Sequence, residues 1–168
     1  MGLFLVRHGR PLAVPGVPAD EWDLDPAGFD AVWALRDSGR LRRATAWYCS
    51  PEPKAVQTAQ LLTEVEVGVV DDLREHARGT GWVEDFGVAV SEAFSDPERS
   101  VRPGWEPLNA CRDRVTAAVR RIRQVHSNDD VVLVGHGTAW TLAVADLTGL
   151  APDLDRWQSL AFPDVLVV

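Results

Sequence analysis

Two stretches of the sequence decide the fold, LFLVRHG at residues 3–9 and VVLVGHG at residues 131–137. Each begins with four apolar residues, and each ends in a histidine that is followed by glycine. Short, fully apolar runs are typical of strands that are buried on both faces of a parallel sheet. The two stretches therefore predict two buried strands, with His8 and His136 just beyond their carboxyl ends.

Strand and helix patterns alternate along the rest of the chain. Further strands are predicted over 44–49 and 65–70, with an edge strand over 162–168. Apolar residues at helical spacing predict helices over 26–38, 54–64, 109–125 and 138–147. This alternation predicts an α/β protein with three α/β/α layers and a mostly parallel sheet.

Residues 71–105 fit the alternation less well. They are rich in Gly, Asp and Trp and show only a weak helical pattern near 82–94. A length of 168 residues is close to the roughly 150 typical of one domain. We therefore expect one domain over 1–168, with an excursion over one face at about 71–105. Tryptophans are expected at a rim (Trp22, Trp82 and Trp105) and in the core (Trp33, Trp47 and Trp140).

Composition excludes several classes of protein. The chain is 46% hydrophobic and 25% charged, which is typical of a globular domain rather than a disordered one. No apolar run approaches the roughly 20 residues that span a bilayer, so we expect a soluble, cytoplasmic protein with no membrane partner. A net charge of −8 argues against nucleic-acid binding. The 2 cysteines have no zinc-site spacing and form no disulfide framework.

Residues that can do chemistry follow several strand ends. In parallel sheets ligands bind beyond the carboxyl ends of the strands, where Arg7 and His8 stand with His136. Lys54 follows the second predicted strand, and Glu75 follows the third. The helix that begins after His136 directs free N–H groups to the same edge, which favours an anion. We expect these cations and histidines to surround a phosphoryl group, with Glu75 supplying a proton.

This arrangement meets the needs of phosphoryl transfer, which requires an in-line nucleophile, cations on the oxygens and a proton for the leaving group. A neutral imidazole at His8 is nucleophilic near pH 7. Glu75 must be protonated to act as an acid, so we expect a raised pKa. The chemistry needs no metal or cofactor, and no carboxylate cluster suited to magnesium is evident in the sequence.

Four motifs together resemble those of the histidine phosphatase superfamily, the phosphoglycerate-mutase-like or histidine acid phosphatase clan. They are RHG at 7–9, SPEPKAVQTA at 50–59, LRE at 73–75 and VGHG at 134–137. The resemblance implies the fold of that superfamily and a phosphatase that forms a phosphohistidine on His8. It implies phosphate binding by Arg7 and by His136, beside the close backbone approach that Gly137 allows, and acid catalysis by Glu75.

One departure bears on activity. Lys54 stands where the superfamily has a second phosphate-binding arginine, and lysine lacks the planar fork of a guanidinium. We expect phosphate binding by Lys54 with reduced turnover, unless another arginine such as Arg10 takes its place. Two alternatives stay open: mutase-type phosphoryl transfer, and a low-activity domain that binds a phosphorylated ligand. The expected partner is a phosphorylated small molecule or a phosphoprotein, and the sequence gives no oligomeric state.

Overall fold

The computed structural model describes residues 1–81 and 83–168. A five-stranded sheet in the order β3-β2-β4-β1-β5 forms its centre. The strands are β1 (Leu3–Arg7), β2 (Ala46–Cys49), β3 (Val67–Val69), β4 (Val131–Gly135) and β5 (Asp164–Val167). Four of them run parallel, and β5 pairs antiparallel with β1 at the edge. The predicted α/β fold with a mostly parallel sheet is confirmed.

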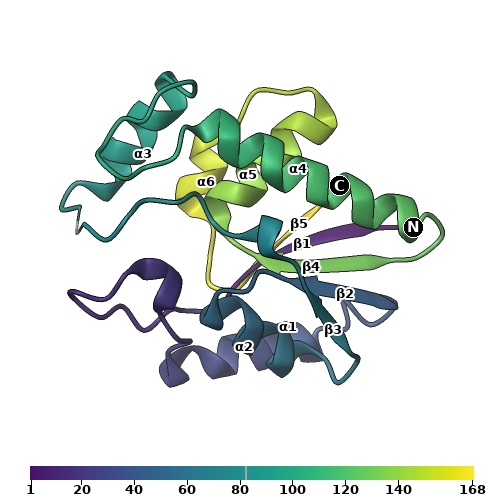
Figure 1. Cartoon of the computed structure of the whole chain (residues 1–168). Helices are drawn as coiled ribbons and strands as arrows, with labels where there is room; N and C mark the ends of the chain where they lie inside the picture. Colours follow the sequence, from purple (N-terminus) through teal and green to yellow (C-terminus); the bar gives the residue numbers. More distant parts are fainter. Residues whose placement is uncertain (82) are drawn as a thin grey trace.

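Helices cover both faces of the sheet. They are α1 (Phe29–Asp37), α2 (Pro53–Leu62), α3 (Phe86–Ser95), α4 (Leu108–Val125), α5 (Gly137–Thr148) and α6 (Leu154–Ser159), with short 3-10 turns η1 (Ala19–Glu21), η2 (Pro26–Gly28) and η3 (Asp71–Leu73). Figure 1 shows α1 and α2 on one face, and α4 and α5 on the other. Side chains alternate along β4: Val131 and Leu133 pack with α4 and α5, whereas Val132 and Val134 pack with α1 and α2.

The excursion packs onto the main core. Within it, α3 buries Ala89, Val90 and Ala93 in the same apolar cluster as Leu73 and Trp105. The expectation that Trp105 lies at a rim is therefore wrong, because its side chain is only 4% exposed. Trp82, the other rim residue expected in this segment, lies outside the described residues. Helix α6 was not predicted; it is short, and its N-cap Asp153 accepts a hydrogen bond from the N–H of Arg156.

The other tryptophan predictions divide. Trp47 and Trp140 are buried as predicted, but Trp33 is 43% exposed on α1. The exposure has a local cause, because α1 has only 9 residues and buries only Val32 among them. Trp33 instead stacks edge-on against Phe29 of the same helix, with ring centroids 5.9 Å apart.

The strand ends converge on one edge of the sheet. Arg7 pairs with Gly135 in the register of β1 and β4, and the N–H of His8 donates to the carbonyl of Gly135. The N–H of Ser50, at the end of β2, donates to the carbonyl of Val134. Three strand ends are thus held level by backbone hydrogen bonds, which fixes the residues that follow them.

Candidate active site

His8 and His136 meet where β1 and β4 end. Their rings are 5.2 Å apart between centroids, and both side chains are buried. Nδ1 of His8 lies 2.6 Å from the carbonyl oxygen of Gly9. Because a carbonyl only accepts, this contact places the proton on Nδ1 and leaves the lone pair on Nε2. Burial, with His136 and Lys54 nearby, holds the pKa of His8 well below its usual value, so the ring is neutral and nucleophilic at pH 7.

Arg7 lies beside the two histidines with part of its guanidinium unsatisfied. Nη1 donates to the carbonyl of Leu160, and the guanidinium carbon stands 3.6 Å from the centroid of the Phe162 ring. Its Nε is buried and has no hydrogen-bond partner among the described residues. Gly137 permits the contact, because a Cβ there would stand 3.3 Å from Nε. Burial lowers the pKa of Arg7 to about 10, and it stays charged at pH 7.

The carboxylate of Glu75 occupies the N-terminus of α5. It accepts backbone hydrogen bonds from Thr138 at 3.1 Å, from Ala139 at 2.9 Å and from His76 at 2.9 Å. The sequence predicts that an anion binds at this helix end. The carboxylate of Glu75 takes up two of the N–H groups that such an anion would use. Burial alone would raise the pKa of Glu75, but Arg78, His136 and the backbone N–H groups together lower it to about 2. The expectation of a raised pKa is wrong for the ligand-free protein.

Lys54 is buried and tied to a neighbour. Its Nζ lies 2.5 Å from a carboxylate oxygen of Glu52 and 2.5 Å from the carbonyl oxygen of Ala19. The ion pair explains a lysine in the first turn of α2, a position that the helix dipole disfavours, because Glu52 is the N-cap of the same helix. Arg10 does not replace the missing arginine at this site. It is exposed and pairs with Asp25 at 3.0 Å.

Sequence reasoning missed two charged residues of this cluster, Glu52 and Arg78. Glu52 is 6% exposed, and its position beside the buried lysine was the signal that could have identified it. Arg78 donates to Thr138 Oγ1 at 2.7 Å and lies 3.9 Å from Glu75. It follows Glu75 in an irregular loop, where spacing carries no information about contacts, so the sequence held no signal for it.

The family model of the histidine phosphatase superfamily, branch 1, matches residues 3–164. The chain belongs to this superfamily. The uncharacterized phosphatase PhoE of Bacillus subtilis is 24% identical to it over 165 residues, which cover 89% of this chain and 79% of PhoE. The resemblance read from the four motifs is therefore confirmed.

Several solved structures share the fold of this chain. A phosphoserine phosphatase from Entamoeba histolytica, in complex with phosphoserine, superposes with a TM-score of 0.80 at 18% identity, covering 99% of this chain and 89% of that one. Bacillus stearothermophilus YhfR gives 0.80 at 21% identity, with coverages of 99% and 89%. A mycobacterial glucosyl-3-phosphoglycerate phosphatase gives 0.72 at 20% identity, with coverages of 95% and 84%. At these identities the likeness establishes the fold alone.

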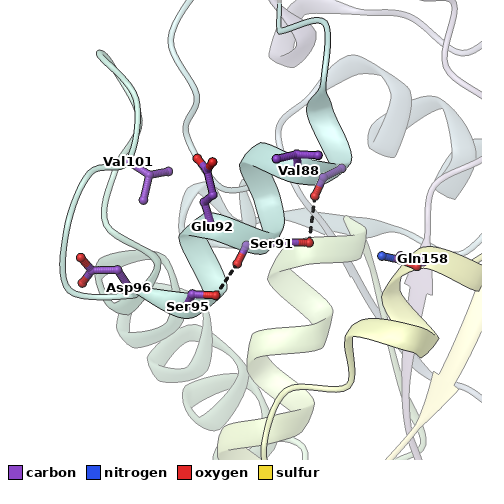
Figure 2. Close-up of a pocket in the computed structure, with 8 residues that line it drawn as sticks. Val88, Ser91, Glu92, Ser95, Asp96, Val101 and Gln158 are labelled. Carbon is purple, nitrogen blue, oxygen red and sulfur yellow. Dashed lines mark hydrogen bonds between the residues drawn. The ribbon is translucent and has the colours of Figure 1, made fainter.

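A surface depression along α3 is lined by residues of that helix and by Val101 and Gln158 (Figure 2). None of these residues belongs to the site around His8 and His136. Within residues 1–81 and 83–168, no three or more His, Cys, Asp or Glu side chains are grouped to hold a metal ion. No helix in the described part of the chain is long and apolar enough to cross a membrane.

Proposed function

We propose that the protein hydrolyses phosphomonoesters through a phosphohistidine on His8. One observation carries the proposal: a neutral imidazole with a free Nε2 lies among cationic and polar groups that lack partners. Nε of Arg7 and Nδ1 of His136 are both buried without a hydrogen-bond partner in the described chain. Buried polar nitrogens in folded proteins are normally satisfied, so unsatisfied ones at a strand edge suit a bound anion.

The proposed reaction has two steps. Nε2 of His8 attacks phosphorus, the P–O ester bond breaks, and its electron pair leaves with the substrate oxygen, which takes a proton. Water then attacks the phosphohistidine, the N–P bond breaks and neutral His8 returns with inorganic phosphate. Arg7 and Arg78 would stabilise the charge on the transferring oxygens, with Lys54 as a further cation. We expect slower turnover than with arginine at position 54, because Lys54 lacks a fork and is tied to Glu52.

Glu75 is the proposed proton donor, and its ionised resting state is compatible with that role. A phosphoryl dianion entering beside the carboxylate raises its pKa, because like charges at short range favour protonation. Glu75 would then take a proton, give it to the leaving oxygen and later accept one from the attacking water. Substrate binding would thus set the protonation state that catalysis needs.

The proposed substrates are phosphorylated small molecules. The structural relatives include phosphatases for phosphoserine and for glucosyl-3-phosphoglycerate, which are both small phosphate monoesters. A phosphoprotein substrate and mutase-type transfer remain alternatives for the same site. A screen over sugar phosphates, hydroxy-acid phosphates, nucleotides and phosphopeptides separates these substrates, and isomerisation faster than phosphate release would identify a mutase.

The test of the proposed function replaces His8 by alanine and measures phosphate release from an aryl phosphate. We expect a loss on the order of 10³-fold or more with the fold retained, because the nucleophile is removed. His126→Ala is the matched control, since His126 caps α4 and bonds to Tyr48 and Asp129 instead. Acid-quenched wild-type protein should carry a phosphohistidine. Wild-type release that survives in His8→Ala would contradict the proposal.

A further inference from the structure

A single buried carboxylate contacts three groups of the candidate active site. Glu52 lies between β2 and α2, and one of its oxygens accepts the Lys54 ammonium at 2.5 Å. The other accepts the backbone N–H of Glu75 at 2.8 Å and stands 3.3 Å from Nε2 of His136. Glu52 thus joins residues from three separate segments around the strand ends.

The burial of Glu52 carries a free-energy cost that Lys54 does not fully offset. Its side chain is 6% exposed, and burial raises the pKa of the carboxyl despite the ammonium beside it. An apolar pair in place of a buried ion pair is often neutral or stabilising. A counterion for Lys54 alone would also not need to face His136. The placement therefore suits a role toward the histidine.

The ring of His136 has one satisfied nitrogen and one free nitrogen. Nε2 lies 2.8 Å from Oγ of Ser50 and faces Glu52, whereas Nδ1 is buried with no hydrogen-bond partner among the described residues. In the ligand-free protein, burial, Lys54, Arg78 and Arg7 lower the pKa of His136 to about 3 although Glu75 opposes them, so the ring is neutral. A carboxylate on Nε2 favours the proton there, which leaves Nδ1 as an acceptor.

We propose that Glu52 is a positioning residue that orients His136 and supplies the negative charge against which His136 becomes an imidazolium when a phosphoryl group binds. The proton comes from solvent and adds to Nδ1, which then donates to a phosphoryl oxygen. The ring would stand between two anions, as a histidine does when a buried carboxylate supports it. This inference rests on the proposed phosphate site, and it gives a role to Glu52, a residue of the 50–59 motif to which the resemblance assigned none.

Several charged groups face Glu52 and His136, and each affects whether His136 takes up a proton. Lys54 faces it from α2, Arg7 and His8 from the end of β1, and Glu75 with Arg78 from the loop after η3. The cations oppose a charged His136, whereas Glu52, Glu75 and the incoming phosphate favour it. Removing the charge of Glu52 should therefore leave His136 neutral even with phosphate bound.

The experiment follows the side-chain nitrogens of His136 by ¹⁵N NMR at pH 7, with and without saturating inorganic phosphate. The chain has only 4 histidines, so the signals can be assigned by substitution. In the wild type, phosphate should protonate both ring nitrogens. In Glu52→Gln the ring should stay neutral, and the dissociation constant for phosphate should rise about tenfold.

Three further variants separate positioning from charge balance and from folding. Lys54→Met keeps Glu52, so phosphate should still produce the imidazolium. Glu52→Leu with Lys54→Met replaces the ion pair by an apolar pair and should abolish the imidazolium without unfolding the protein. Asp146 lies on α5, the helix whose N-terminus faces the site, and it pairs with Arg120 of α4. Asp146→Asn removes this carboxylate and should leave phosphate binding unchanged.

Two results would overturn the inference: a His136 that stays neutral in the wild-type phosphate complex, or an imidazolium that persists in Glu52→Gln with unchanged affinity. In the second case Glu52 serves only as the counterion of Lys54. A wild type that binds phosphate and protonates His136, yet releases no phosphate from any ester, would refute the proposed function and leave the role of Glu52 standing.

Discussion

Glu75 combines two properties that are usually separate, a carboxylate held by backbone N–H groups and a place beside the proposed phosphoryl site. We predict that Glu75→Gln lowers kcat/KM for alkyl phosphates by about 10²–10⁴-fold, but lowers it much less for aryl phosphates. The reason is that only a basic leaving oxygen needs a proton in the transition state. Phosphate release across a series of leaving groups checks this, and an equal loss for every ester would remove Glu75 from the acid role.

Lys54 and Glu52 should depend on each other for stability. We predict that Lys54→Ala lowers the free energy of unfolding by about 3 kcal/mol, because the buried carboxylate of Glu52 loses the charge that offsets its desolvation. Adding Glu52→Leu should recover most of the loss, since no unpaired charge then remains. Urea denaturation at pH 7 measures both variants. A single variant as stable as the wild type would mean that Glu52 takes up a proton at little cost.

The junction between β4 and α5 fixes the backbone on which His136 stands. A Cβ at Gly135 would lie 2.5 Å from the ring of Trp140, and that ring is fully buried with its Nε1 donating to the carbonyl of Val6. We predict that Gly135→Ala costs about 1–3 kcal/mol in stability, because neither the ring nor the strand can move away.

Thermal unfolding of Gly135→Ala needs a control in which the same substitution meets no atoms. Gly87→Ala in α3 serves, because a Cβ there has nothing within 4 Å. It should stabilise the protein by about 0.5–1 kcal/mol through the lower helix propensity of glycine. Equal effects of the two substitutions would show that Trp140 can repack.

Acid stability is a property of the whole molecule that the buried histidines should dominate. His8, His76 and His136 have pKa values below their usual value, chiefly because they are buried. Unfolding exposes them, so the unfolded chain binds more protons as the pH falls below about 6.5. The contribution of these neutral histidines to the free energy of unfolding is therefore complete above that pH and is lost progressively below it.

We predict that the free energy of unfolding falls between pH 7 and pH 5, with about 2 kcal/mol of the fall due to His136, whose pKa is about 3 when folded. In His136→Gln the fall should be smaller by that amount. Carboxyl groups with lowered pKa values, such as Glu75, titrate below this window and leave it clear. Denaturant titrations at the two pH values measure the effect, and an identical pH dependence in the variant would contradict it.

The amino-acid sequence by itself determined the layered α/β fold, the parallel strands and the strand-end residues Arg7, His8, Lys54, Glu75 and His136. These features depend on short-range patterns: apolar runs, helical spacing and motifs that stand directly after a strand. In a parallel sheet such motifs meet at one edge, so their order along the chain is enough to predict that they converge.

Only the tertiary structure decided which charged residues meet at the strand ends and how they shift one another's pKa values. Glu52 and Arg78 lie in loops whose conformation no periodic pattern encodes. The low pKa of Glu75 comes from Arg78, His136 and backbone N–H groups, one of which lies at a helix end 63 residues away in sequence. The exposure of Trp33 and the burial of Trp105 likewise depend on which faces α1 and α3 present to the core. Coulomb interactions and burial act through space, and sequence neighbours do not report those distances.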